Sequence, residues 1–359
     1  MSDVSATPPG GYGMLGVLIA DSGAIRQRLG TLTQQAGDGL VSDTYAGLGA
    51  QGAATSLSPQ IAHASALQAG IGVATSQMSV AQGALSSIGG IASSFYAQTL
   101  SLDGLNAGNV DTAAAARSAL AQVASLLDSK EGNVYVFAGQ DSANPPVPNP
   151  DQIASSGFAT QIAAAVAGLG GSGAAATIAA TLAVGQSNAA GASPFSAALS
   201  QPAAVLAGLR TSVGTGDGQR QATGILASGN AVAGSPGGST TGSYARDILR
   251  SLATLAGMSS AQVGAAGFAA LVSDVRSGLG SAVTALNQDA GIMGNQQTAL
   301  TATQTQMGEA ATALKTQLGS VQEVDMAQTL TQITATQTQL QASYQLIAGM
   351  QSLSLVKYI

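Results

Sequence analysis

The 359-residue sequence has no cysteine, no tryptophan and few charged residues. Without cysteine there is no disulfide, no thiolate nucleophile and no cysteine metal ligand. Charged residues make up 8 % of the chain, against roughly 25 % in an ordinary soluble domain. Hydrophobic residues nevertheless make up 45 %. This composition argues against a largely disordered chain, because disordered chains are usually poor in apolar residues and rich in charge.

Positive charge is especially scarce, with 11 Lys and Arg residues against 17 Asp and Glu residues and a net charge of −6. The three lysines, Lys130, Lys315 and Lys357, lie far apart, so no basic patch exists to bind a phosphate backbone. Nucleic acid is therefore not an expected partner. The lone histidine, His63, supplies neither a multi-ligand metal site nor the base of a convincing serine-type triad. We expect no catalytic residue, no cofactor, no metal and no enzyme activity.

The first residues carry no export signal of the Sec type. Residues 1–11 are rich in proline, glycine and serine and predict a disordered N-terminal tail. A short apolar run follows at 14–20, but no lysine or arginine precedes it, as a Sec signal peptide would require. The run is also too short to span a bilayer. We expect neither a Sec signal nor membrane insertion.

Heptad spacing predicts long helices in the first third of the chain. Apolar residues from Leu15 to Ala36 recur at alternating steps of three and four, with Ser22 as one polar interruption, and residues 37–39 end the helix. Ser58 and Pro59 predict the start of a second helix, with Ser58 as its N-cap. Its seam runs from Leu67 to Leu102. A helix over 59–105 would span roughly 70 Å and needs another long helix beside it.

The middle of the sequence predicts a small mixed module. Asp111 is a predicted N-cap for a helix that ends near Leu127, and residues 134–139 predict a strand after a turn. A hairpin is predicted through 214–218, and the tract 166–193 stays unassigned. Short helices are predicted at 157–168, 194–209 and 243–256.

Two groups of residues in this module have a plain structural interpretation. Residues 168–173 are glycine-rich but lack the Lys-Ser/Thr that completes a phosphate-binding loop, so a flexible loop is predicted. Asp247, with Arg246 and Arg250, is interpreted as an ordinary set of charges on a helix surface. Neither group predicts a catalytic or ligand-binding site.

Long helices return at the C-terminal end. One is predicted over 261–318, with Gly319 and Ser320 as its end. A last helix is predicted over 325–354, with Asp325 interacting favourably with its dipole. It again has heptad spacing. The residues predicted to form the assembly seam of both terminal helices are Leu15, Leu18, Ile25, Leu29, Leu32, Leu330, Ile333, Leu340, Tyr344, Ile347, Met350 and Leu353.

Together these patterns predict a mainly α fold. Both termini form a long antiparallel helical coiled coil or bundle, and a small mixed α+β domain is inserted in the middle. The predicted segments are a tail at 1–11, an N-terminal core helix and loop at 12–58, rod helices and a hairpin at 59–140, a variable outer domain at 141–257, a returning rod helix at 258–320 and a C-terminal core helix at 321–359.

Several stretches resemble the bacterial flagellin superfamily. Residues 320–327 are similar to the start of its closing helix, and residues 39–48 are similar to the loop after its first helix. Residues 337–344 resemble the closing helix of the hook-associated protein 3 subfamily. Residues 128–139, followed by Pro145 and Pro146, resemble the hairpin of the hook-filament junction proteins, the hook-associated protein 3 subfamily. The ending at 352–359 also resembles that subfamily.

The resemblance implies a structural subunit of the flagellum that joins hook to filament. Such proteins leave the cell unfolded through the flagellar type III export apparatus, with an export chaperone, and act outside the cell. Their partners are hook-associated protein 1, flagellin and copies of themselves. The terminal helices form the inner polymer core, and the middle domain faces outward. A filament-forming flagellin is the alternative, and a secreted enzyme with a site in the middle domain is a remote one.

Overall fold

The computed structural model describes residues 12–48, 51–102, 109–216, 218–232 and 234–356. The predicted tail at 1–11 lies outside them. Within these ranges the chain forms eleven α-helices and two small antiparallel sheets. The long helices belong to the two ends of the chain, and a small mixed region lies between them in sequence. The prediction of a mainly α fold is therefore confirmed.

The described residues divide into two compact units. The terminal unit comprises those up to Ser65 and from Gly308 onward, and the middle unit runs from Ala66 to Met307. Helices α2 (Gln51–Ser101) and α10 (Phe268–Gln322) contribute residues to both units.

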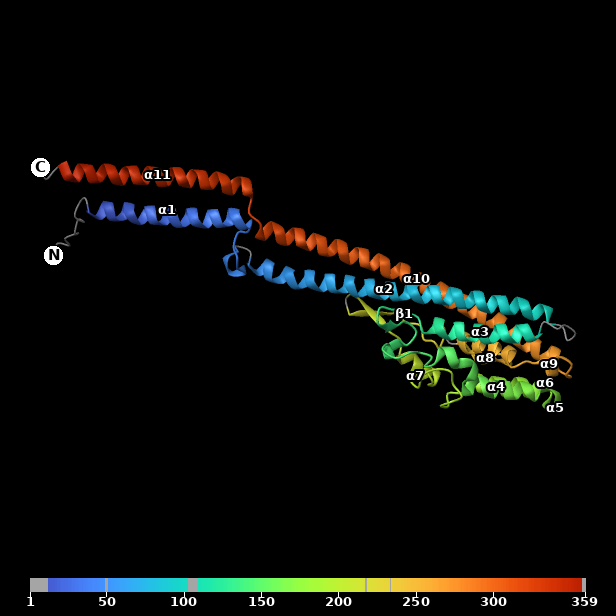
Figure 1. Ribbon diagram of the computed structural model, residues 1–359. Helices are drawn as coiled ribbons and strands as arrows, with labels where there is room; N and C mark the ends of the chain where they lie inside the picture. The colour runs from blue at the N-terminus through green and yellow to red at the C-terminus, as the bar shows by residue number, and fades with distance from the viewer. Residues whose placement is uncertain (1–11, 49–50, 103–108, 217, 233, 357–359) are drawn as a thin grey trace, which may run out of the picture. The chain divides into compact units, whose positions relative to one another are not determined.

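In the terminal unit, α1 (Tyr12–Asp38) and α11 (Met326–Val356) lie side by side and antiparallel (Figure 1). Helix α1 ends where its glycines predicted, and Gly39 takes a φ of +72°, the left-handed conformation common just after a helix. The segment that follows α1 forms backbone hydrogen bonds with the segment that precedes α11. The Val41 N–H donates to the carbonyl of Gln322 at 2.8 Å, and the Val324 N–H donates to the carbonyl of Gly39 at 3.1 Å.

The start of α11 agrees with the prediction for Asp325. Its Oδ1 atom accepts the backbone N–H groups of Ala327 at 2.9 Å and Gln328 at 3.1 Å. Two of the otherwise unpaired donors of the first helical turn are thereby satisfied. A carboxylate at this end also interacts favourably with the helix dipole.

The predicted start of the second helix was wrong. Helix α2 begins at Gln51, so Pro59 lies inside it and Ser58 is not its N-cap. An internal proline removes a backbone donor and costs helix stability. Packing holds the preceding turns in place, because Ala54 and Leu57 are buried. The Ser58 hydroxyl donates to the carbonyl of Ala54 at 3.1 Å. A short 3₁₀ helix, η1 (Tyr45–Gly47), precedes the start of α2 along the chain.

In the middle unit, α2 and α10 run antiparallel in a regular register. The Gln304 amide donates to the carbonyl of Gln68, and Arg276 donates to Thr99 at the other end of the pair. The predicted α2 seam faces this core. Its buried members are Ile71, Ala74, Met78, Ala81, Leu85, Ile88, Ala92, Phe95 and Thr99. The heptad spacing of α2 was therefore a correct guide to its buried face.

Two further layers of helices cover this pair (Figure 1). Helix α3 (Asn109–Leu127) packs on α8 (Tyr244–Ala256), and α8 packs on α4 (Gly157–Ala167) and α6 (Ala174–Gln186). A single hydrophobic cluster joins the three layers. The short elements of this unit are α5 (Leu169–Ser172), α7 (Ala203–Gly208), α9 (Ser260–Val263), η2 (Gly139–Asp141) and η3 (Pro150–Ser155).

Two hairpins complete the middle unit. Strand β3 (Ser212–Gly216) pairs with β4 (Gln219–Ala222), which confirms the predicted hairpin. Strand β1 (Lys130–Glu131) pairs with β2 (Val134–Tyr135), so the strand predicted over 134–139 is too long. After Tyr135 the chain leaves the ladder, because Phe137 is buried in the core and Gly139 turns with a φ of +63°.

Other predicted boundaries were also wrong. Helix α3 begins at Asn109, so Asp111 lies in its first turn and is not the N-cap. Of the helix predicted over 194–209, only α7 forms. The tract 168–173, predicted to be a loop, contains α5. Helix α10 continues through Gly319 to Gln322, because its end is set by the pairing with the connection after α1.

Candidate assembly surface

The α1 face toward α11 follows the predicted spacing. Leu32 is buried, and Leu18, Ile25 and Leu29 are half-buried. Ser22, the polar interruption, is also buried, and its hydroxyl donates to the carbonyl of Ile19 in its own helix at 2.8 Å. The side chain of Leu15 lies outside the described residues.

On α11, the face that packs against α1 is shifted from the predicted seam. At every second seam position, the buried residue is the one just before the predicted residue. Burial recurs at Thr329, Thr336 and Ser343, with half-buried Ile333, Leu340, Ile347 and Met350 between or beyond them. The predicted residues Leu330 and Tyr344 are 53 % and 46 % exposed. The side chain of Leu353 is outside the described residues. The intramolecular seam thus contains hydroxyl side chains where apolar ones were predicted.

Hydroxyl groups of two of these buried side chains donate hydrogen bonds to backbone carbonyls nearby in the chain. The Thr329 hydroxyl donates to the carbonyl of Asp325, and the Ser343 hydroxyl donates to the carbonyl of Leu340, each at 2.8 Å. A small side chain whose donor is turned back to its own helix can sit against a neighbouring helix without an unpaired polar group. Sequence reasoning missed these residues because it searched for large apolar side chains. The regular spacing of Thr329, Thr336 and Ser343 was the available signal.

Because of this offset, α11 exposes a stripe of large apolar side chains, Met326, Leu330 and Tyr344. At about 100° per residue these three positions share one face of the helix. Met326 is 43 % exposed. Other large apolar side chains are exposed elsewhere in the terminal unit, among them Val17 and Ile19 on α1 and Leu346 on α11. Exposed apolar side chains that gather on one face of a helix can form an interaction surface.

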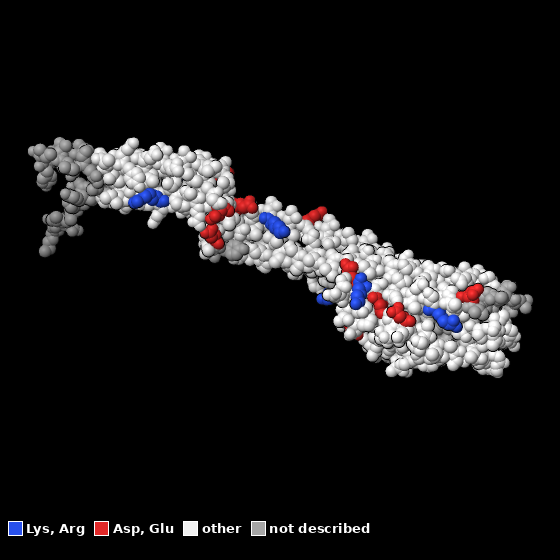
Figure 2. Space-filling view, viewed as in Figure 1, with Lys and Arg blue, Asp and Glu red and all other residues white. Residues whose placement is uncertain are grey.

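Charge is almost absent around this stripe. Helix α11 contains no Asp, Glu, Lys or Arg between Met326 and Val356. In Figure 2 the charged side chains of the terminal unit gather near the α1–α2 and α10–α11 connections, and most of the visible length of the α1–α11 pair is uncharged. A helix without charge is weakly hydrated, and its small Thr, Ser and Ala side chains allow close approach of another helix. The α11 stripe is therefore a candidate protein-binding surface.

The charges predicted to lie on the surface of α8 are buried instead. Arg246, Asp247 and Arg250 are 7 %, 3 % and 1 % exposed. The Arg250 Nη1 atom forms an ion pair with Asp274 Oδ2 on α10 at 3.1 Å. The interpretation as a surface charge set was wrong, because α3, α4 and α6 surround α8 and leave it no solvated face.

Burial raises the pKa of three carboxyl groups in the middle unit, those of Asp128, Asp247 and Asp289. It raises the pKa of Asp247 to about 6, although Asp247 Oδ1 accepts the backbone N–H of Thr241 at 2.7 Å. It also raises the pKa of Asp128 to about 6, where Oδ1 accepts the Val147 N–H at 2.8 Å. Asp247 and Asp128 each hold a loop against a helix, and neither belongs to a catalytic constellation.

His63 is exposed on α2. Among the described residues, no group of three or more His, Asp or Glu side chains could hold a metal ion. No helix in the described part of the chain is long and apolar enough to cross a membrane.

Residues 277–359 match the family model of the bacterial flagellin C-terminal helical region. No curated protein matches the chain. The matched segment contains most of α10 and all of α11, including the α11 stripe. This match supports the bacterial flagellin superfamily, whose members assemble into an extracellular appendage. It suggests a structural, self-associating flagellar subunit and points away from an enzyme.

Proposed function

We propose that this chain is a structural subunit that joins the flagellar hook to the filament. In this proposal the α11 stripe packs against helices of neighbouring axial subunits. The observation that carries it is the exposure of Leu330 and Tyr344 on a helix that has no charge and lies within the flagellin-matched segment. Burial of such side chains favours association by roughly 25 cal/mol per Å² of apolar area.

The proposed partners are hook-associated protein 1 on the hook side and flagellin on the filament side, together with copies of this chain. The proposed export route is the flagellar type III apparatus with a dedicated chaperone. Resemblance of residues 128–139 and 352–359 to junction proteins supports the subtype. The same proposal includes the six segments predicted from the sequence, from the tail at 1–11 to the core helix at 321–359.

A filament-forming flagellin is the second candidate, because the matched C-terminal region is that of flagellins. Self-assembly separates the two. Purified chain is mixed with sheared filament seeds and followed by electron microscopy. A junction subunit caps the seeds or leaves them unextended, whereas a flagellin lengthens them into tubes.

Labelling on intact flagella tests where along the flagellum this subunit lies. An epitope in the exposed turn at Gly132, between β1 and β2, is visualised on intact flagella by immunogold electron microscopy. We expect gold at the boundary between hook and filament. Gold along the whole filament would replace the junction role with the flagellin role, and gold nowhere on the flagellum would refute both.

A further inference from the structure

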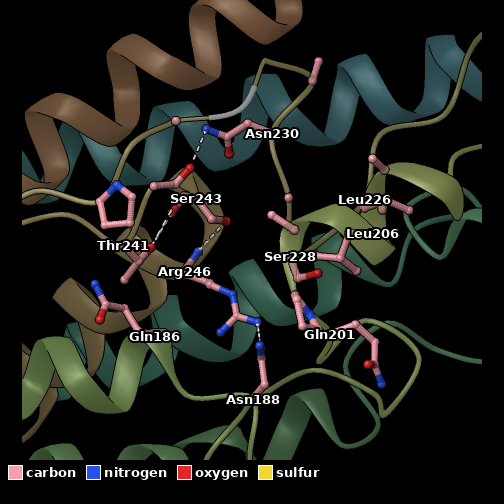
Figure 3. A pocket seen from close by; sticks show the side chains of 18 of the residues that line it. Gln186, Asn188, Gln201, Leu206, Leu226, Ser228, Asn230, Thr241, Ser243 and Arg246 are labelled. Atoms are coloured by element: carbon pink, nitrogen blue, oxygen red, sulfur yellow. Dashed lines mark hydrogen bonds between the residues drawn. The ribbon is translucent and has the colours of Figure 1, made fainter.

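A cavity of about 670 Å³ lies in the middle unit, beside α7 and the start of α8 (Figure 3). Its volume is within the range of about 300–1,000 Å³ that small-molecule sites occupy. Two arginines, Arg210 and Arg246, line it, and no Asp or Glu among the described residues does. Its other polar lining comes from amides and hydroxyls, namely Gln186, Asn188, Gln201, Ser228, Asn230, Thr241 and Ser243.

Arg246 is held rigidly at one wall of this cavity. Its Nη1 atom donates to the carbonyls of Gly185 at 3.0 Å and Ser187 at 3.1 Å, and its Nη2 atom donates to Asn188 Oδ1 at 2.7 Å. The guanidinium also stacks over the ring of Phe195, 5.2 Å from its centre. Figure 3 shows the side chain reaching from α8 into the cavity toward Asn188.

The bonds of Arg246 do not use all its donors. A guanidinium has five N–H groups, and the Nε–H and one Nη2 hydrogen have no partner among the described residues. Arg246 is 7 % exposed as a whole, but its Nε atom is not among the fully buried atoms that lack a partner in the described part of the chain, which belong to Tyr244, Arg250 and Ser251. The free Nε–H is therefore reached by solvent and can donate to an acceptor atom of a ligand in place of water.

Neither arginine of the cavity forms an ion pair with a carboxylate in the described part of the chain. The nearby acids are engaged elsewhere. Asp247 accepts the backbone N–H of Thr241, and Asp289 accepts those of Ala231 and Val232. Arg210 donates to the carbonyl of Asn230. Neither carboxylate lines the cavity, whereas both arginines do. Arg210 nevertheless lies close enough to Asp289 to oppose the rise that burial causes in the pKa of that carboxyl group.

A second cavity of about 410 Å³ shares Asn188 and Gln201 with the first. Serine hydroxyls and the apolar side chains of Phe195 and Ile153 line it. The two cavities thus border each other at a pair of amide side chains, and both arginines belong to the first cavity.

We propose that the first cavity binds a sugar acid, with the carboxylate on Arg246 and Arg210 and the hydroxyls on the amides of Asn188 and Gln201. Guanidinium groups bind carboxylates through short, charge-assisted hydrogen bonds. Amide and hydroxyl side chains suit the mixed donors and acceptors of a polyol. Leu206 and Leu226, which also line the first cavity, can cover the C–H face of a sugar ring.

This site is independent of the proposed junction role. Its residues belong to the middle unit, whereas the α11 stripe belongs to the terminal unit. A subunit with this site would bind acidic saccharides outside the cell in addition to its structural task.

The test is titration calorimetry of the full chain with D-glucuronate, D-glucose and D-glucose 6-phosphate. We expect glucuronate to bind and glucose to bind at least about tenfold more weakly, because glucose lacks the charge-assisted bonds. Arg210→Gln should weaken glucuronate binding at least about tenfold. The matched control is Arg220→Gln, which removes an exposed arginine on β4 outside the cavities and should leave binding unchanged.

Arg246→Gln removes the other cation, and thermal melting shows whether this buried variant still folds. If it does not fold, Arg210→Gln and Gln201→Ala carry the test. Equal binding of glucose and glucuronate, no binding of glucuronate, or equal losses in Arg210→Gln and Arg220→Gln would each overturn the proposal. Tighter binding of glucose 6-phosphate than of glucuronate would overturn the sugar-acid assignment in favour of a phosphorylated ligand. Leu330→Asp should leave glucuronate binding intact, which keeps this test separate from that of assembly.

Discussion

Arg250 on α8 and Asp274 on α10 form an ion pair with 3.1 Å between Nη1 and Oδ2, and both side chains are buried. Arg250 also donates to the carbonyl of Ser239 at 2.6 Å, so one guanidinium joins two helices and a loop. Its Nε atom has no partner in the described part of the chain. The pair is a point where the middle unit is sensitive to substitution.

Asp274→Ala should lower the free energy of unfolding of the middle unit by about 3–5 kcal/mol, because it leaves a buried guanidinium charge unpaired. Chemical denaturation followed by circular dichroism measures this loss. Asp151→Ala, at an exposed position, is the control and should change stability by less than about 0.5 kcal/mol. A small effect of Asp274→Ala would show that Arg250 is hydrated or paired elsewhere.

Two glycines of α10 should respond in opposite ways to replacement by alanine. A Cβ atom at Gly278 would lie 3.1 Å from Nη2 of Arg250 and 3.2 Å from the carbonyl of Ser239, whereas a Cβ at Gly291 meets nothing within 4 Å. We expect Gly291→Ala to stabilise by about 0.5–1 kcal/mol through helix propensity. Gly278→Ala should destabilise by about 1–3 kcal/mol through overpacking. Thermal melts of both variants check the signs, and equal shifts would contradict the packing of α8 on α10.

The raised pKa of Asp247 predicts a pH dependence of stability. A carboxyl group with a pKa of about 6 in the folded chain, and 3.8 as its ordinary value, binds more protons folded than unfolded between these two pH values. Stability from this group therefore falls as pH rises from about 4 to 6. Asp247→Asn should remove about 2 kcal/mol of this fall. Urea unfolding at pH 4.5 and 7 measures it.

The control for that experiment is Asp151→Asn, which should keep the wild-type pH profile. A profile of Asp247→Asn that parallels wild type would mean that Asp247 is ionised normally in the folded chain. Asp128, whose pKa burial also raises, should add a smaller dependence of the same sign, because its carboxyl group is more solvated.

A substitution in the α11 stripe should impair assembly of the flagellum without impairing folding of the subunit. Leu330→Asp places a charge on the exposed face and should abolish swimming motility while the protein is still secreted and helical. Gln339→Asp adds the same charge on an exposed position of the opposite face and should leave motility intact. Motility that survives Leu330→Asp, or is lost equally with Gln339→Asp, would contradict an assembly role for the stripe.

The intramolecular seam should behave differently from the stripe. Leu340→Asp introduces a charge between α11 and α1, so helicity of the terminal unit should fall along with motility. Circular dichroism of the purified variant measures this loss of helix. Normal helicity in Leu340→Asp would show that the half-buried Leu340 contributes little to the pairing of the two helices.

Much of the fold followed from local spacing. The heptads of α2 identified its buried face, and the glycines after α1 marked its end. Pro59 was misleading, because helix boundaries also depend on the packing of residues such as Ala54, which no local signal shows. The long stretches of Ala, Gly and Ser at 166–193 gave too little contrast for any period to stand out.

The sequence by itself determined that both ends of the chain form long helices, about how long the terminal helices are, and that they carry almost no charge, because these properties depend on composition and on neighbours along the chain. Only the tertiary structure decided which side of α11 faces α1, since a shift of one residue turns a helix by about 100° and exposes Leu330 in place of Thr329. It also decided that Arg246 and Arg250 are buried, because that depends on which helices surround α8. Which side chains are buried, and which way a helix face points, depends on the residues that are neighbours in space. The spacing of residues along α11 is compatible with either of two faces packing on α1, so the sequence does not select between these faces.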